Sequence, residues 1–453
     1  MDCVIFYELV ERSYENDLLI KTELERRGYR AKICNLFWRD FWKCLFWRPK
    51  VLLMSGCRDT KQLSQQLPFL FKRDLVIINL QEEQIAFSSD ADLDLFMPHG
   101  RAKEAYHFSW GSFSDNYMKK ANVLPNHVIK IPPIQFDMCR KSWDEYFFSR
   151  QEIAEEFHLN IKKKWILFAS DFCITSMCNT REQLEKLMNT VSDVYEKVFN
   201  AEKQMEELLF SWWDAYLTTH KDAIVIYRPH PSENRKHEFI EQLMSKHENF
   251  VYIRDYSIKQ WIHVIDIYTT WISTSIMEAY YGEIPCFALG ISSTIVENGI
   301  AIPLFDYSKY ISDYMQFQTV MDEPEAYKDG FFPINFEMAT YYYGQATEKM
   351  AYIEICNYIE KILINDELQK EMKLRLTKTE REIEKKERGH YLWITFYNDL
   401  FCLLKPLLWY VIPNKRDSIL KFESDLKRFD KKVLRQKEQR IRKLLMQQNF
   451  ENE

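Results

Sequence analysis

The chain has 453 residues, of which 46% are hydrophobic, 15% aromatic and 28% charged, a composition typical of a folded protein and not of a disordered one. Its length indicates two or three domains, and its net charge of -6 argues against a general nucleic-acid binder, which would carry a basic excess. The ten cysteines are scattered, with no CxxC pair and no Cys/His cluster at zinc spacing, so we expect reduced thiols in a cytoplasmic protein and neither a disulfide framework nor a structural zinc site.

Residues 1–149 are predicted to form an N-terminal Rossmann-like domain. Helical patterns such as "NDLLIKTELERRGY" alternate with short apolar runs at 4–7, 51–54, 75–80 and 128–131. This alternation is typical of βαβ units on a parallel sheet. The first residues lack the basic segment, apolar run and cleavage site of a secretory signal, so the chain is expected to begin directly with a strand.

A polar helical segment, 150–164, is predicted to link this domain to a second Rossmann-like domain, 165–350, which is followed by a helical extension, 351–453. In the second domain, apolar runs predict five strands in chain order, at 165–170, 223–227, 250–253, 266–273 and 284–290. No internal repeat is evident, which argues against solenoids and propellers. The expected fold class is therefore α/β with two parallel sheets.

The stretch "VIYRPHPSENR" places Arg228 and His230 directly before prolines at the end of an apolar run. A residue before proline is extended, so the i, i+2 spacing puts both side chains on one face. A guanidinium offers forked donors to a phosphate or carboxylate, and an imidazole adds a donor or a proton. The pair indicates an anion site beyond the carboxyl end of a strand, where open parallel sheets bind ligands. The alternative is a rigid turn with Arg228 in an ordinary salt bridge.

A second polar element, "WISTSIMEAYYGEIP", lies at the end of a later strand. Ser273, Thr274 and Ser275 close the strand and open a helix, whose free N–H groups attract a phosphate. Glu278 has two interpretations. It accepts hydrogen bonds from sugar hydroxyls, or it caps its own helix in a capping box with Ser275.

Two C-terminal segments raise the question of a membrane. Residues 391–412 are long and apolar, but polar residues and a proline at 398–399 and 405–406 interrupt them, so a position at the membrane interface is favoured over a spanning helix. From Lys427 to Lys443, nine Lys or Arg stand against two acidic residues, which favours anionic lipid headgroups. The alternatives are a buried helix between domains and a solvated charged helix or coiled coil.

Four stretches together resemble GT-B glycosyltransferases, and most closely the surface carbohydrate biosynthesis proteins of bacterial capsule and O-antigen pathways. They are "YRPHPSE" (227–233), "STSIMEAYYGEIP" (273–285), "WGSFSDNYMKKANVLPNHVIKIPPIQFD" (110–137) and "LVERSYENDLLIKTELERRGY" (9–29). Capsule Kdo transferases and CDP-glycerol glycerophosphotransferases are more distantly similar. The chain departs from the family in two places: "IPPIQFD" lacks a glycine that is common there, and Gly282 stands one place earlier than the usual glycine.

The resemblance implies two Rossmann-like domains facing a cleft. A nucleotide-activated sugar, CMP- or UDP-linked, is held by the second domain, and the acceptor enters from the first. The donor-binding residues are then Arg228, His230, Ser273, Thr274, Ser275 and Glu278. Because Arg228 and His230 can neutralise the leaving phosphate, no metal is required, and no permanently bound cofactor is expected.

An inverting transfer also needs a base for the acceptor hydroxyl. The stretch "VIINLQEEQ" offers Glu82 and Glu83 just past a strand, and Glu83 stands where the family pattern favours the base, although a solvated loop carboxylate is the alternative. A rival signal is "SSDADLDLF", in which Asp90, Asp92 and Asp94 could hold a divalent ion as in GT-A enzymes. That run is predicted to start a helix and not to end a strand, and no GxSxG motif supports a hydrolase.

The expected protein is thus a metal-independent, inverting glycosyltransferase that extends a capsule or O-antigen polysaccharide on a lipid carrier. Its partners would be a nucleotide-sugar donor, a lipid-linked saccharide acceptor and the anionic inner face of the cell membrane, without nucleic acid. Two alternatives share the fold. One is a polyol-phosphate transferase that uses a CDP-linked donor, and the other is a non-catalytic assembly protein that binds a nucleotide.

Overall fold

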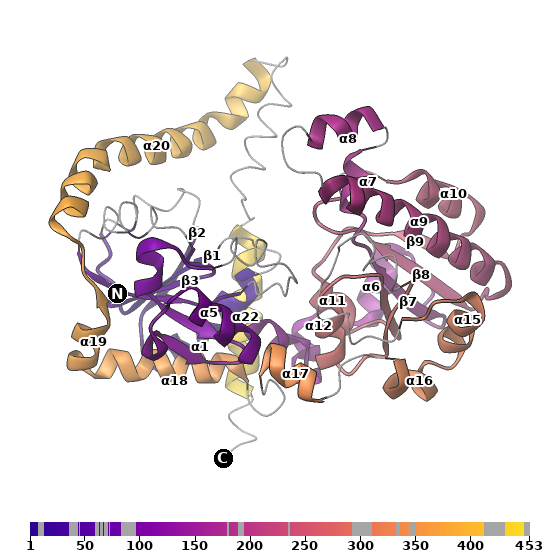
Figure 1. Cartoon of the computed structure of the whole chain (residues 1–453), viewed down its shortest axis with the longest axis horizontal. Helices are drawn as coiled ribbons and strands as arrows, with labels where there is room; N and C mark the ends of the chain where they lie inside the picture. The colour runs from indigo at the N-terminus through magenta and orange to yellow at the C-terminus, as the bar shows by residue number, and fades with distance from the viewer. Residues whose placement is uncertain are drawn as a thin grey trace. The chain divides into compact units, whose positions relative to one another are not determined.

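The computed structural model describes residues 1–7, 13–35, 44, 46–58, 63, 67, 71, 73–82, 97–178, 181–188, 194–233, 236–291, 310–331, 336–344, 350–411 and 431–447. These residues form two units, each built on its own β-sheet (Figure 1). Unit 1 comprises the described residues up to Asp137 and from Ala339 onward, and unit 2 comprises those from Met138 to Met338.

Unit 1 contains a seven-stranded sheet in the order β2-β1-β3-β4-β5-β6, with β12 paired antiparallel to β4. The strands are β1 (Cys3–Tyr7), β2 (Ala31–Asn35), β3 (Val51–Met54), β4 (Leu75–Asn79), β5 (Tyr106–Ser109), β6 (Val128–Lys130) and β12 (Lys373–Leu374). Strands β1, β3 and β4 are buried along their whole length, which accounts for their uninterrupted apolar sequences. Three of the seven strands, β2, β5 and β12, were not predicted from the apolar runs of the sequence.

The helices of unit 1 come from both ends of the chain. They are α1 (Glu15–Arg26), α5 (Ser112–Lys120), α17 (Phe336–Tyr343), α18 (Ala351–Ile364), α19 (Asp366–Met372), α20 (Lys378–Val411) and α22 (Lys431–Gln447). Both α18 and α22 contact α1. The carboxylate of Asp137 fixes the start of α18, because it accepts the N–H groups of Ala351 (2.9 Å) and Tyr352 (2.7 Å). The described part of the expected helical extension, 351–453, therefore belongs to the first unit.

Helix α22 carries part of the basic tail, and two of its basic residues pair with acidic residues of α1. Three ion pairs join it to α1: Lys437–Glu15 (2.5 Å), Glu438–Lys21 (2.5 Å) and Arg442–Glu25. Ile441 and Leu445 of the same helix are buried. At least two of the nine basic side chains thus serve the attachment of α22 to unit 1, an arrangement that differs from the exposed lipid-binding tail expected from the charge pattern.

Helix α20 includes most of the apolar segment 391–412. Its first turn is held by ion pairs of Arg381 with Asp74 (2.7 Å) and of Arg101 with Glu380 (3.0 Å). Further along, Trp393, Phe396 and Tyr397 are more than half exposed, so these side chains are not part of a buried helix. Among the described residues, none of the helices is both long enough and apolar enough to cross a bilayer.

Unit 2 contains a five-stranded parallel sheet in the order β11-β10-β7-β8-β9. The strands are β7 (Lys164–Ala169), β8 (Ala223–Arg228), β9 (Phe250–Tyr252), β10 (Ile267–Thr270) and β11 (Cys286–Ala288), and all five were predicted from the sequence. The first strand, β7, lies in the middle, with β8 and β9 on one side and β10 and β11 on the other. This is a doubly wound sheet whose strand order reverses between β7 and β10.

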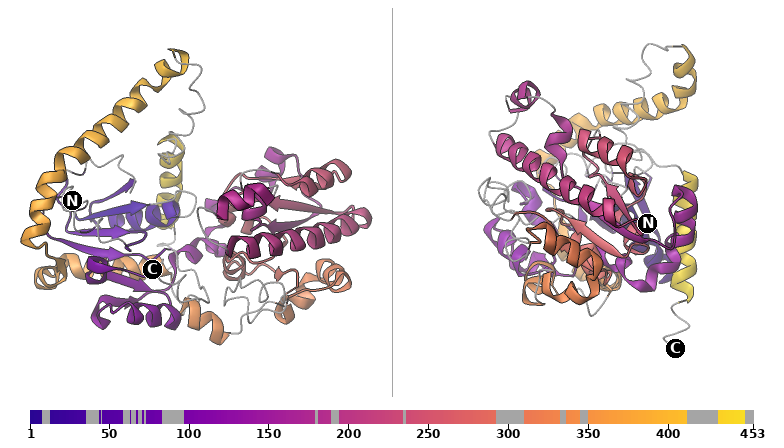
Figure 2. Two further views of the ribbon diagram at one scale, coloured as in Figure 1. Left: turned by 45° about the horizontal axis from the view of Figure 1, so that its top comes forward. Right: turned by 90° about the vertical axis from the view of Figure 1, so that its right-hand side faces the viewer.

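Helices cover both faces of this sheet (Figure 2). Helices α9 (Val194–Thr219) and α10 (Glu238–Lys246) contact each other, as do α11 (Ile258–Ile262) and α12 (Ile276–Tyr281). The remaining helices are α6 (Arg150–Phe157), α7 (Cys173–Met177), α8 (Arg181–Met188), α15 (Tyr314–Asp322) and α16 (Pro324–Phe331). Helix α6 covers half of the segment 150–164 that was expected to be a linker. Arg150 pairs with Asp266 (2.8 Å) and lies 4.3 Å above the Trp165 ring, which anchors the segment in unit 2.

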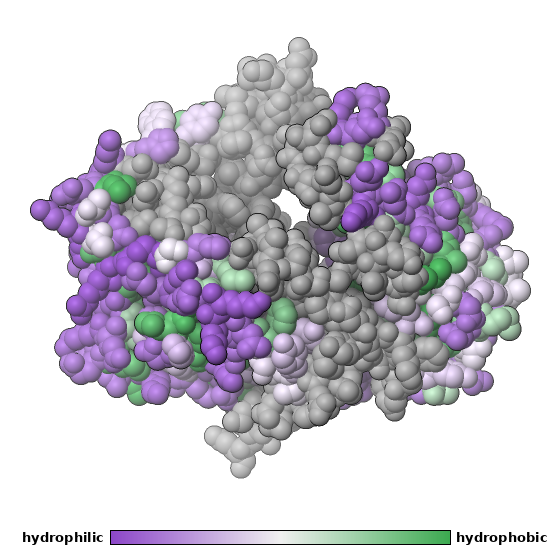
Figure 3. Space-filling view, viewed as in Figure 1, coloured by the Kyte–Doolittle hydropathy of each residue, from purple (hydrophilic) through white to green (hydrophobic). Residues whose placement is uncertain are grey.

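Two parallel-sheet α/β units with C-terminal helices are the fold class that the sequence predicts. The chain passes from unit 1 to unit 2 after Asp137 and returns to unit 1 at Ala339, whereas the expected domains ended at 149 and 350. On the face shown in Figure 3, the described surface is mainly hydrophilic, and its hydrophobic areas are small and separate, as expected of a charged, folded chain.

Candidate donor-binding site in unit 2

The three central strands of unit 2 end at the same level. Ala169 of β7 pairs with Arg228 of β8 on one side and with Thr270 of β10 on the other. The residues that follow these strands therefore meet at one edge of the sheet, beside the reversal of strand order between β7 and β10. Open α/β sheets bind ligands at this position.

Arg228 is the last residue of β8 and is half-buried. Its guanidinium donates to the carbonyl oxygens of Tyr256 (3.0 Å) and Pro229 (3.4 Å). Tyr256 has a φ of +67°, a conformation that costs a bulky residue about 1–3 kcal/mol and that tends to occur at functional sites. The loop after β9 thus bears strain at the residue whose carbonyl orients the arginine.

His230 is held in one tautomer. Its Nδ1 accepts the backbone N–H of Ser232 (3.1 Å), so the ring proton of the neutral imidazole is on Nε2. Burial and the positive charges of Arg228 and Arg254 lower the pKa of His230 to about 4. At neutral pH, His230 is therefore a neutral ring that donates from Nε2.

A buried carboxylate supports the loop that carries His230. Glu233 accepts the backbone N–H of His230 (3.0 Å), and the hydroxyl of Tyr227 lies 3.0 Å from its other oxygen. The same hydroxyl is 2.6 Å from Ser170 Oγ, which joins the ends of β7 and β8. Burial raises the pKa of Glu233. This network fixes the backbone of the motif, so its glutamate has a structural role in addition to any chemistry of the loop.

The second predicted element follows β10. Ser273 Oγ is 2.8 Å from Ser275 Oγ, which in turn is 2.6 Å from the hydroxyl of Tyr268. Thr274, between the two serines, is exposed. Ser275 is the N-cap residue of α12 but makes no side-chain cap hydrogen bond. The capping box considered for Glu278 is therefore not formed.

Glu278 lies in the first turn of α12, in surroundings that disfavour its charge. Burial raises the pKa of Glu278 to about 7, although the positive charges of Lys259 and Arg228 act in the opposite direction. The carboxyl is close enough to Arg228 to feel its charge, so the predicted acceptor and the predicted anion-binding arginine share one environment. A ligand hydroxyl that donates to Glu278 would favour its charged form.

The turn at the end of α12 contains the early glycine, Gly282, that the sequence analysis noted. Glu283, one place after Gly282, has a φ of +60°, in the left-handed region that favours glycine. Gly282 itself is needed for close packing, because a Cβ there would lie 2.4 Å from Ile262 Cγ2. The strained position in this chain is thus the one where the enzymes that its sequence resembles usually carry glycine.

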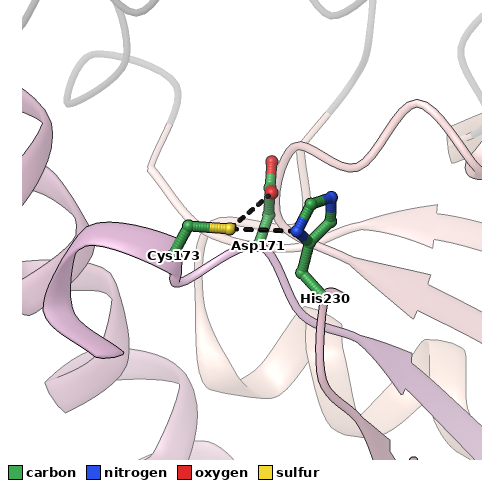
Figure 4. Close-up of side chains that lie close together, drawn as sticks. All are labelled: Asp171, Cys173 and His230. Carbon is green, nitrogen blue, oxygen red and sulfur yellow. Dashed lines mark hydrogen bonds between the residues drawn. The ribbon is translucent and has the colours of Figure 1, made fainter. Parts of the chain in front are cut away.

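The structure also brings together three residues that the sequence analysis did not connect: Asp171 and Cys173, which follow β7, and His230 (Figure 4). Cys173 Sγ lies 3.1 Å from His230 Nδ1 and 3.6 Å from Asp171 Oδ1. Burial and Asp171 raise the pKa of the Cys173 thiol, and burial and Glu233 raise the pKa of Asp171 to about 7. Among the nine cysteines whose side chains are described, Cys173 is half-buried and the others are buried. The group combines a thiol, an imidazole and a carboxyl, which are metal-ligand types, and its members are too far apart in the sequence to show a zinc spacing. Its sequence signal is "SDFC" at the end of the strand that neighbours β8.

The base proposed for the acceptor hydroxyl, Glu83, lies outside the described residues, as do Asp90, Asp92 and Asp94. Its neighbour Glu82 is described and is buried in unit 1 just after β4. Glu82 accepts a hydrogen bond from Asn16 (3.4 Å) and donates its backbone N–H to Ser55 (3.0 Å). Glu82 is thus not the solvated loop carboxylate that was its alternative.

No protein-family model and no curated protein matches the chain. Solved structures similar to it include a UDP-GlcNAc 2-epimerase from Neisseria meningitidis bound to UDP-GlcNAc, at 12% identity over 80% of this chain and 100% of that one, with a TM-score of 0.49. The wall teichoic acid polymerase TagF is similar at 11% identity over 80% and 88%, with a TM-score of 0.47. The S. aureus MnaA structure with UDP is similar at 12% identity over 80% and 97%, with a TM-score of 0.49.

Proposed function

We propose that this protein is a glycosyltransferase that moves a sugar from a nucleotide-activated donor to a growing surface polysaccharide on a lipid carrier. The observation that carries the proposal is the convergence of Arg228, His230 and Glu278 at the edge where the strand order of unit 2 reverses. A cationic fork, a neutral N–H donor and a hydroxyl acceptor are the groups that a nucleoside diphosphate sugar needs for its phosphates and its ribose or sugar hydroxyls.

In this proposal, Arg228 and His230 act on the leaving group. Negative charge grows on the donor phosphate as the glycosidic bond breaks, and the guanidinium and the Nε2–H stabilise that charge. As the phosphate becomes more negative, protonation of His230 also becomes easier, because the anion offsets the two arginines that lower its pKa. Ser273, Thr274 and Ser275 would complete the phosphate contacts, and Glu278 would accept the hydroxyls. These groups supply the charge stabilisation without a metal ion.

The acceptor half of the reaction is assigned to unit 1. Glu83 would take the proton from the attacking hydroxyl of a lipid-linked saccharide. The exposed aromatic side chains of α20, including Trp393 and Phe396, are of the type that sits at a membrane interface, and they support a peripheral position at the inner face of the cell membrane. The basic tail is a weaker support, since α22 uses some of its charges on α1.

The first test is nucleotide binding to the full chain. Calorimetric titration with CMP, CDP, UMP and UDP should identify one base and at least micromolar affinity. Arg228→Ala should weaken binding on the order of 10- to 100-fold, because a hydrogen bond to a charged group contributes about 1.5–3 kcal/mol. Lys203→Ala, which removes an exposed cation of α9, is the matched control. Equal affinity of the unaltered chain for all four nucleotides, or equal affinity of the unaltered chain and Arg228→Ala for the preferred nucleotide, would contradict the proposed donor site.

The second test identifies the product. With the preferred donor and a lipid-linked acceptor, mass spectrometry should find a new glycosidic bond and the free nucleotide. A new phosphodiester would assign the chain as a polyol-phosphate transferase. Nucleotide binding without transfer to any acceptor would assign it as a non-catalytic assembly protein. Where transfer is found, an unchanged rate in Glu83→Gln would contradict the role of Glu83 as the base.

A further inference from the structure

Asp171 and Cys173 have no role in the proposed transfer, but they lie beside the proposed phosphate ligand His230. We propose that these three residues form a zinc-binding site, and that zinc bound there prevents the donor phosphate from reaching His230. The second half of this statement rests on the proposed function, and the first half does not.

The spacing of the donor atoms supports this site. A tetrahedral zinc ion with a Zn–S bond of about 2.3 Å and a Zn–N or Zn–O bond of about 2.1 Å holds its ligand atoms roughly 3.5 Å apart. The observed distances from Cys173 Sγ are 3.1 Å to His230 Nδ1 and 3.6 Å to Asp171 Oδ1, and the ligand atoms of all three residues lie within 4.8 Å of one another. Figure 4 shows the sulfur linked by dashed lines to both the imidazole nitrogen and a carboxylate oxygen. Small side-chain rotations would therefore suffice to close the site on an ion.

The donor set selects the type of metal. A thiolate and an imidazole favour zinc over magnesium or calcium, which prefer oxygen ligands. Three protein ligands leave one tetrahedral position open, as in zinc sites that accept an exogenous ligand. The three residues are all partly exposed, so an ion has access to them.

The chemistry of binding balances without an added reactant. Zinc displaces the proton of the Cys173 thiol, which passes to solvent, and takes the Nδ1 lone pair of His230 in place of the Ser232 N–H. Ser232 is exposed, so water can accept its N–H at little cost. The carboxyl groups of Glu202 and Glu233 lie close enough to interact with Asp171, and burial raises the pKa of both, so a cation at the site would favour their charged forms. The positive charges of Arg228 and Arg254, which lower the pKa of His230, oppose a cation there.

The consequence for the donor is competition. Zinc on Nδ1 displaces the Ser232 N–H that holds the ring, so the Nε2–H of His230 is no longer kept in the orientation that the loop sets for a phosphate. Zinc should therefore raise the apparent dissociation constant of the donor nucleotide, while a chelator restores it.

The direct test uses the tag-free full chain without nucleotide. After equilibrium dialysis against zinc, metal analysis should find about one ion per chain with the Asp171, Cys173 and His230 ligands. Cobalt substitution should produce the intense near-ultraviolet band of a cobalt thiolate. Cys173→Ala should lose this band and lower zinc affinity by more than the roughly 10- to 100-fold that follows the loss of an outer-shell partner. Asp171→Asn should weaken zinc binding without removing the band.

The matched control is Cys178→Ala, which removes a buried thiol at the end of the same helix. It should bind zinc and show the cobalt band like the unaltered chain. Absence of zinc binding at micromolar concentrations, or a site that survives Cys173→Ala, would overturn the zinc site whether or not the protein is a transferase. If zinc binds but leaves nucleotide affinity unchanged in both the unaltered chain and Cys173→Ala, the competition is wrong while the metal site stands.

Discussion

Replacing Glu278 with glutamine should make the protein more stable at alkaline pH while impairing its donor binding. Burial raises the pKa of this carboxyl from an ordinary 4.5 to about 7. The folded protein therefore holds the protonated form more readily than the unfolded chain does. The resulting stabilisation is complete below the unfolded pKa and is lost as pH rises through about 7. Above pH 7, the unaltered chain bears the cost of a poorly solvated charge, and the neutral amide of Glu278→Gln does not.

The size of the effect follows from the two pKa values. Their difference of about 2.5, at 1.36 kcal/mol for each pH unit, corresponds to about 3 kcal/mol. Because Glu278 is partly exposed, solvent reduces this to the order of 1–3 kcal/mol. For a unit of about 200 residues, each kcal/mol changes the melting temperature by roughly 2–4 °C.

Differential scanning calorimetry of the full chain at pH 5 and pH 8 measures the difference. The transition that includes unit 2 should occur several degrees higher in Glu278→Gln than in the unaltered chain at pH 8, and this gap should shrink at pH 5. Glu283→Gln is the control, since Glu283 is exposed and its ion pair with Lys141 is at the surface. A gap of the same size at both pH values would refute the assigned pKa, and unchanged nucleotide affinity in Glu278→Gln would refute its role as a hydroxyl acceptor.

Three further outcomes are expected. Ile441→Ala in α22 should destabilise unit 1 by about 2–5 kcal/mol, because the side chain is fully buried, whereas the exposed Met446→Ala should not; equal melting temperatures would mean that the tail does not stabilise unit 1. Glu283→Gly should raise the melting temperature of unit 2 slightly, by relief of about 1 kcal/mol of backbone strain, while Gly282→Ala should lower it, and the reverse order would contradict the geometry of this turn. Treatment with a chelator should not lower the rate of sugar transfer, so loss of activity with rescue by manganese would return the acidic run at 90–94 to the site.

The local patterns of this chain were sufficient to predict its fold class and the five strands of unit 2. Short apolar runs between polar helical patterns indicate buried strands of a parallel sheet, because a strand buried on both faces must be apolar throughout. The same reasoning located Arg228, His230 and Ser273 at strand ends. It did not show what lies beside them, because periodicity describes a side chain's own element and not its neighbours.

The tertiary structure decided everything that depends on which segments are adjacent. Cys173 and His230 are 57 residues apart and meet only because β7 and β8 pair in the register that joins Ala169 to Arg228. The charge pattern of α22 suits anionic lipid and the acidic residues of α1 equally well, and only packing selects α1 as a partner. The same limit applies to Glu278, whose spacing from Ser275 suited a capping box that the structure does not form. Burial raises its pKa, and Lys259 and Arg228, which other elements of the fold bring to it, act against that rise.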